Sequence, residues 1–149
     1  YDTSESVRLA ALSESTFVPL AQLARKLRGE EKYHLMHGRS WVARLGSATE
    51  ESRKRMQTAL ATCYPHALGL FEPTEADEPV AQYGIGLRER ELKAQWESAV
   101  VPGLQAGGLS VADNVLPVYG GRVGRHPAAL TELLDGMQLV YNIDPTAKW

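Results

Sequence analysis

The chain has 149 residues, of which 44% are apolar and 23% charged, the proportions of one globular domain rather than of a disordered segment. With 16 Lys and Arg against 18 Asp and Glu, its net charge of −2 leaves no basic excess for general nucleic-acid binding. The single cysteine, Cys63, excludes an internal disulfide framework and a cysteine-rich zinc site, and suits a reducing cytoplasm. No apolar run reaches the roughly 20 residues that a membrane-spanning helix needs.

The first nine residues are polar and show no period, so no element is predicted there. Residues 17–45 predict a long helix, because apolar residues recur three and four positions apart and fall within a sector of about 120°. Pro19 suits the first turn of this helix, and Gly46 is a stop signal. The stripe expected to be buried consists of Leu20, Leu23, Ala24, Leu27, Leu35, Trp41, Val42 and Leu45.

A second helix is predicted directly afterwards, with Ser47 and Glu50 as a capping box. The short connection makes the two helices antiparallel neighbours, and Pro65 predicts a kink in the second. Its expected apolar face consists of Met56, Leu60, Cys63, Ala67, Leu70 and Phe71, with Cys63 as an inert core thiol.

The rest of the chain predicts two further helices joined by irregular segments. Residues 72–86 are acidic and rich in turn formers, and 107–125 are rich in glycine, so both are expected to be loops. The helix over 87–104 should turn Leu92, Trp96, Val100 and Leu104 inward. The helix over 126–142 should bury Leu130, Leu133, Leu134, Met137 and Tyr141. The predicted class is all-α, a single helical domain over 1–149.

Glu31 and His34 are the strongest candidates for chemistry. They lie three residues apart on one face of the first long helix, the Glu-x-x-His spacing that helical bundles use to bind two metal ions. A complete site needs a second such element and two more carboxylates, and this chain has one element only. The alternative is a buried polar network of Glu30 or Glu31 with His34 and a basic side chain.

A weaker candidate is the segment 120–125, Gly-Gly-Arg-Val-Gly-Arg, before the last helix. Its backbone N–H groups and arginines could bind an anion, but it lacks the Lys-Ser/Thr ending of a nucleotide-binding loop and follows no strand. A turn that anchors the last helix is the favoured interpretation.

Several segments, taken in order and spacing from Leu20 to Trp149, resemble the structural subunit of the bacterial ring-1,2-phenylacetyl-CoA epoxidase, the PaaC-type family of phenylacetate degradation. The resemblance is carried by Glu-Glu-Lys-Tyr-His-Leu at 30–35, Trp-Val-Ala-Arg-Leu-Gly at 41–46, Arg-Met-Gln at 55–57, Leu-Lys-Ala-Gln-Trp-Glu at 92–97, Gly-Gly-Arg at 120–122 and Pro-Thr-Ala-Lys-Trp at 145–149.

The resemblance implies a ferritin-like antiparallel helical bundle of which this chain lacks the N-terminal helices. It implies a cytoplasmic, non-catalytic subunit that holds no cofactor, with neither catalytic nor cofactor-binding residues, and that supports a di-iron catalytic subunit and other subunits of the complex. Glu30, Glu31 and His34 are then vestigial metal ligands, with Glu30 matching the family's glutamate while the helical wheel favours Glu31. Tyr33 and Trp41 are candidate interface residues, because aromatic side chains dominate interface hot spots.

Two departures and two rival interpretations accompany this resemblance. The family's Thr-Glu-His run is replaced here by Pro127, Ala128 and Ala129. A bundle without its first helices would expose an apolar stripe, so association with another copy or another subunit is expected. The rivals are a di-iron oxidase in its own right, with Glu31 and His34 as two ligands, and an unrelated helical interaction domain. No nucleic acid and no membrane is expected as a partner.

Overall fold

The computed structural model describes residues 1–148, and within them it is all-helical, as predicted. The chain divides into two compact units, Tyr1–Tyr119 and Gly120–Trp149. The single domain expected over 1–149 stays a prediction. None of the helices in the described part combines the length and the apolar character that crossing a bilayer requires.

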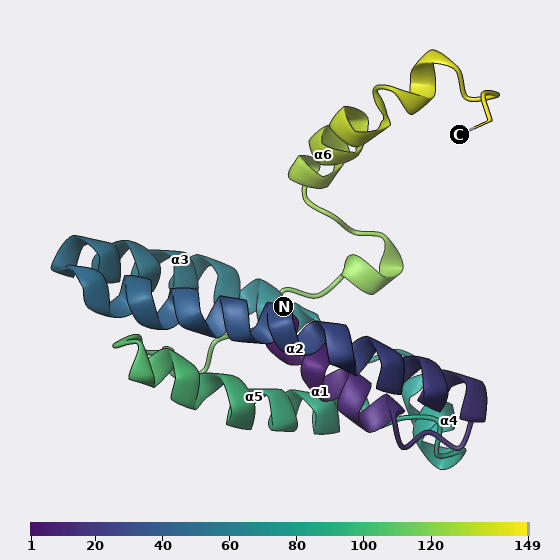
Figure 1. Cartoon of the computed structure of the whole chain (residues 1–149), viewed down its shortest axis with the longest axis horizontal. Helices are drawn as coiled ribbons and strands as arrows, with labels where there is room; N and C mark the ends of the chain where they lie inside the picture. Colours follow the sequence, from purple (N-terminus) through teal and green to yellow (C-terminus); the bar gives the residue numbers. More distant parts are fainter. Residues whose placement is uncertain (149) are drawn as a thin grey trace. The chain divides into compact units, whose positions relative to one another are not determined.

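The first unit is a bundle of helices that belongs to the ferritin-like class expected above. Its first helix, α1 (Asp2–Leu12), packs against both α2 (Val18–Ala48) and α5 (Glu89–Ala106), as Figure 1 shows. The prediction of no element over the first nine residues was wrong. The helix begins with a polar run, so its sequence period is weak. Tertiary contacts stabilise it instead, since Val7 and Ala11 pack on the core and Arg8 binds α5.

The helices α2 and α3 (Glu50–Gly69) form the predicted antiparallel hairpin. The cap differs from the prediction: Thr49 is the single connecting residue, and its hydroxyl accepts a hydrogen bond from the Ser52 N–H at 3.0 Å. Ser47 instead lies in the last turn of α2 and donates to the Ala43 carbonyl. Gly46 does not end the helix. It lies where α2 crosses the end of α5, and a Cβ there would collide with the Gly107 carbonyl.

The core of the first unit forms where α3 and α5 meet. The Trp96 ring lies 5.5 Å from Tyr64 and 5.3 Å from Phe71, measured between ring centroids. The predicted inward residues of α5 are confirmed: Leu92, Trp96 and Leu104 are buried, and Val100 packs against them. Cys63 is a correction, because Tyr64, one residue on, faces the core and turns the Cys63 side chain to solvent.

Hydrogen bonds and an ion pair fix the connecting segments of the first unit against its helices. The loop predicted over 72–86 contains a short helix, α4 (Asp77–Gln82), and Arg88 binds Glu78 on it through two nitrogens at 2.9 Å. After α5 the chain follows α3 without helix or strand. The Gln57 side chain donates to the Ser110 carbonyl and accepts from its N–H. The Val118 N–H reaches the Pro65 carbonyl at 3.0 Å.

The second unit contains α6 (Ala128–Gln138) and the 3₁₀ turns η1 (Gly121–Val123) and η2 (Tyr141–Ile143). The predicted helix over 126–142 is therefore shorter than expected. Within this unit Leu133, Leu134, Met137 and Tyr141 are not covered, and the inward face predicted for the helix stays a prediction. A unit this short cannot enclose a core of its own, because chains below about 40 residues expose most of their surface.

Candidate functional site

Glu31 and His34 meet on one face of α2, as their spacing predicts. The His34 Nδ1 lies 3.1 Å from the Glu31 Oε2. The Glu31 side chain is only 13% exposed, whereas that of His34 is 68% exposed. Glu30 is exposed, so the helical wheel was right in placing Glu31 rather than Glu30 on the inner side. The N-terminal end of α1 lies beside this part of α2, with the Asp2 carboxylate close to Gly38.

The site around Glu31 and His34 is acidic, because several carboxylates lie near it. The Glu31 Oε1 is buried and has no hydrogen-bond partner among the described residues. Glu5, burial and Glu31 each contribute to raising the pKa of the Tyr1 hydroxyl, with Glu5 contributing most. Glu31 raises the pKa of His34, first by its hydrogen bond and then by its negative charge, because both favour the protonated imidazolium. The pair is therefore a partly buried carboxylate with an exposed imidazole at its edge.

Residues 1–148 alone do not complete a di-iron centre around this pair. In residues 1–148 no group of three or more His, Cys, Asp or Glu side chains could hold a metal ion. Glu31 and His34 supply two ligands at most, and Glu30 is exposed on α2. A bundle site for two metals needs carboxylates from four helices, and the neighbouring α3 and α5 bring none to this face in the described residues.

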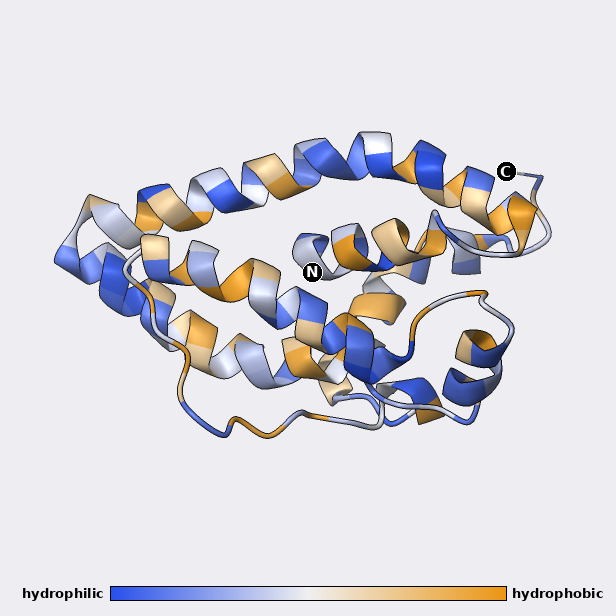
Figure 2. Cartoon of the chain, turned by 90° about the horizontal axis from the view of Figure 1, so that it is seen from below, coloured by the Kyte–Doolittle hydropathy of each residue, from blue (hydrophilic) through white to orange (hydrophobic). Residues whose placement is uncertain are grey.

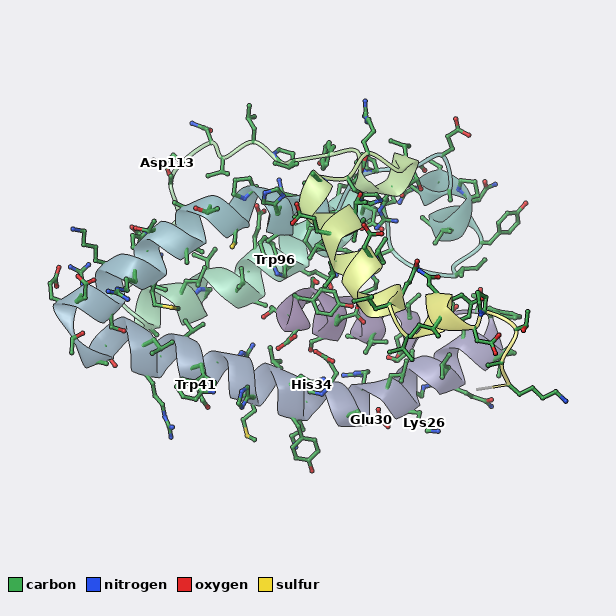
Figure 3. The ribbon with its side chains drawn as sticks, turned by 90° about the horizontal axis from the view of Figure 1, so that it is seen from above. Lys26, Glu30, His34, Trp41, Trp96 and Asp113 are labelled. Carbon is green, nitrogen blue, oxygen red and sulfur yellow. The ribbon has the colours of Figure 1, made fainter. Side chains whose placement is uncertain are left out.

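The two candidate interface residues are both exposed on α2. Tyr33 and Trp41 are eight residues apart and therefore about 80° apart around the helix. The Trp41 ring meets the edge of the His37 ring at 6.1 Å. In Figure 3, Trp41 follows Lys26, Glu30 and His34 along α2, whereas Trp96 lies among the helices. The role of either residue at an interface stays a prediction.

The stripe that the sequence assigns to the core is only half covered. The deeply buried positions of α2 are the small residues Ala21, Ala24 and Gly46, which let neighbouring helices approach closely. Four large members of the stripe remain substantially exposed. Figure 2 shows hydrophobic residues along the whole length of this helix. The exposed members are Leu23, Leu27, Trp41 and Leu45.

Two hollows lie in the first unit. A groove of about 380 Å³ with a mostly apolar lining runs between α2 and α5 beside the start of α1, where Leu35, Val42 and Leu104 line it. A second, more polar hollow of about 470 Å³ lies between Tyr64, Lys93 and the segment 110–115. The lining of the second hollow includes the charged side chains Lys93, Glu97 and Asp113.

The weaker sequence candidates lie on other elements of the chain. Residues 120–125 form a tight turn in the second unit, in which the Arg125 N–H donates to the Gly120 carbonyl at 2.9 Å. A turn that anchors α6 is therefore the interpretation that the backbone supports, and no bound anion is needed for it. Cys63 and His66 are exposed on α3, and His126 is exposed in the second unit.

An ion pair between Arg8 and Glu89 has no signal in the local sequence pattern. Arg8 on α1 binds Glu89 on α5 through two nitrogens, at 2.8 and 2.7 Å, and Glu89 is buried. Arg8 also donates to the Leu70 carbonyl at 3.4 Å. No local pattern predicts a pair of residues so far apart in the chain. The one general indication is that a buried carboxylate such as Glu89 needs a positively charged partner. The pair joins α1 to α5 and supports the end of α1 near Glu31.

Comparison with known proteins shows the family to which the chain belongs. The family model described as phenylacetic acid catabolic protein matches residues 1–149. One relative, a subunit of the 1,2-phenylacetyl-CoA epoxidase of Escherichia coli (strain K12), is 33% identical over 138 residues. These residues cover 93% of this chain and 56% of the relative, so the chain spans about half the length of the protein it matches. The chain belongs to the phenylacetic acid catabolic protein family.

Proposed function

We propose that this chain is a non-catalytic structural subunit of a multicomponent di-iron monooxygenase that epoxidises phenylacetyl-CoA. Its place in phenylacetate catabolism follows from the family. The finer role is supported by the 33% identical relative, which is a subunit of such an epoxidase. In this proposal the two iron ions belong to the catalytic subunit, and this chain supplies no cofactor.

The observation that carries the proposal is the incomplete ligand set on α2. Glu31 and His34 have the spacing of a metal-binding element, yet no third ligand approaches them within residues 1–148. A bundle site that activates oxygen at two metal ions needs several carboxylates in addition to such a pair. The helices of the first unit then serve as a rigid support, and the exposed Tyr33 offers a contact to the catalytic subunit or to another subunit.

The test is reconstitution of phenylacetyl-CoA epoxidation with the remaining subunits of the complex. We expect turnover to depend on adding this chain, because the catalytic subunit needs its support. We expect the double variant E31Q/H34Q to support turnover within about two-fold of wild type, since neither side chain touches the reaction. The matched control is E30Q/H37Q, which changes the same residue types on the exposed side of α2.

A loss of 100-fold or so in kcat for E31Q/H34Q alone, with the complex still assembled, would assign catalysis to this chain and overturn the proposal. Turnover that is independent of this chain would overturn it as well. Complex assembly is followed by gel filtration, so that a failure to assemble is distinguished from a failure of chemistry.

A further inference from the structure

Residues 111–117 run beside α3 without helix or strand, and hydrogen bonds hold this segment at both of its ends. At the first end, the Gln57 side chain donates to the Ser110 carbonyl at 2.8 Å and accepts from the Ser110 N–H at 3.0 Å. At the second end, the Val118 N–H donates to the Pro65 carbonyl at 3.0 Å. We call residues 111–117 the strap, and these two sets of hydrogen bonds its anchors.

Between its anchors the strap is held by few interactions. Within residues 1–148, no backbone–backbone hydrogen bond involves residues 111–117. Val111 and Val115 pack against the core, whereas Leu116 is 80% exposed. The strap turns at Asn114, whose φ of 56° lies in the left-handed region. A segment with so few buried contacts opens at a lower free-energy cost than the helices beside it.

The strap covers a hollow rather than closely packed side chains. This hollow of about 470 Å³ lies between residues 110–115 and the two helices, where Tyr64 and Leu68 of α3 and Val101 of α5 line it. An unfilled space removes the van der Waals contacts that hold a segment on a protein surface. The contacts that resist opening are therefore concentrated in the two anchors and the two valines.

The walls of this hollow come from α3, α5 and the strap. Among the described residues, neither α1 nor α2 contributes to its lining. The row of α5 that lines it recurs every four residues from Lys93 to Gln105, whereas Val100, Gly103 and Leu104 line the groove beside the start of α1. At 100° per residue, these two rows lie about 130° apart around α5. The hollow under the strap is thus separate from the groove beside the first residues of the chain.

We propose that the strap opens and closes over this hollow as one piece, so that release of either anchor loosens the other. The anchors are coupled because Val111 and Val115, the inward contacts of the strap, lie between them. Opening uncovers buried Leu68 and admits small polar molecules to the charged lining, while α3 and α5 keep their own hydrogen bonds. This inference goes beyond the proposed function and does not depend on it.

Hydrogen exchange followed by NMR tests the coupling, with the Ser110 and Val118 amides as reporters. Q57A removes the first anchor directly. If the strap opens as one piece, the Val118 N–H at the other end should also exchange about ten-fold faster, because losing hydrogen bonds of ordinary strength changes an opening constant by this factor. Q95A, which changes an exposed glutamine of α5, is the matched control and should leave both amides unchanged.

G69A tests the coupling from the other end. A Cβ at Gly69 would collide with the Val118 carbonyl, so this substitution pushes the second anchor away from α3. We expect the distant Ser110 N–H to exchange about ten-fold faster. G103A is the matched control, because a Cβ at Gly103 on α5 meets nothing within 4 Å.

Thiol labelling supplies a second readout of access to the hollow. In a C63S background, which removes the native exposed thiol, L68C places a buried thiol beneath the strap. Iodoacetamide, a small neutral probe, should label L68C about ten-fold faster when Q57A is added, because labelling follows the population of the open strap. Far-UV circular dichroism checks that each variant is folded.

Three outcomes would overturn the proposal. If either distant amide keeps its wild-type exchange rate, the anchors are independent contacts. If the amides of α3 and α5 accelerate equally with those of the anchors, the helices open together with the strap. If L68C reacts at the same rate with and without Q57A, the hollow is reached without movement of the strap. None of these results bears on the reconstitution of epoxidation, so the two proposals fail separately.

Discussion

At the scale of single residues, Glu31 illustrates how position on a helix decides the chemistry of a carboxylate. It follows exposed Glu30 in sequence, yet the 100° step around α2 turns it toward the start of α1. The helical wheel predicts this correctly from periodicity. It does not predict that one Glu31 oxygen is buried without a hydrogen-bond partner among the described residues, because that depends on where α1 lies.

His34 should titrate at a higher pH than a free imidazole. Glu31 raises its pKa first by a hydrogen bond and then by charge. The pair therefore stabilises the fold fully below the ordinary histidine pKa, and this contribution is lost as the pH rises through the raised pKa. NMR titration of the His34 ring should show its pKa fall in E31Q and change less in E30Q, because Glu30 contributes least to the shift. Equal pKa values in wild type and E31Q would contradict the pair.

Arg8→Met should lower the free energy of unfolding by about 2–4 kcal/mol, because it leaves Glu89 as a buried charge without its guanidinium. Urea denaturation measures this directly. The matched control is Arg90→Met, one residue from Glu89 but exposed, which should change stability by less than about 0.5 kcal/mol. Equal effects of the two substitutions would show that the Arg8–Glu89 pair does not support α1.

At the scale of elements, the sequence predicts the long helices well and their neighbours less well. The periods of α2, α3 and α5 are long enough to be recognised, and Leu92, Trp96 and Leu104 lie where the spacing predicts. The short α1 and α4 have too few turns for a period. The apolar stripe on α2 is present as predicted, but the most deeply buried residues of this helix are the small ones, Ala21, Ala24 and Gly46. Only part of the stripe therefore faces the core.

The crossing of α2 and α5 depends on a glycine. Gly46→Ala should destabilise the protein by about 2–4 kcal/mol, because the new methyl group would collide with the Gly107 backbone, which cannot move aside as a side chain can. Gly29→Ala on the same helix meets nothing within 4 Å and should stabilise it by about 0.5–1 kcal/mol. Thermal and urea unfolding of both variants check this. A neutral Gly46→Ala would mean that the helices are further apart.

At the scale of the whole molecule, the chain combines a packed helical unit over 1–119 with a short second unit, within which Leu133, Leu134 and Met137 have no cover. The sequence predicts α6 from its period but assigns it an inner face that no core of its own can cover. Periodicity reports which side of a helix is apolar and does not report what covers that side. The same reason explains the exposed Leu27 and Trp41 of α2, which intramolecular packing alone was expected to bury.

In the role we propose, this chain supports oxygen chemistry without performing it. The iron content of the protein, purified alone after growth with excess iron, distinguishes this role from catalysis. A structural subunit should hold close to no iron per chain and show no iron absorption in the visible spectrum. About two iron atoms per chain, lost on substitution of Glu31 and His34, would contradict it and would make the chain a di-iron oxidase in its own right.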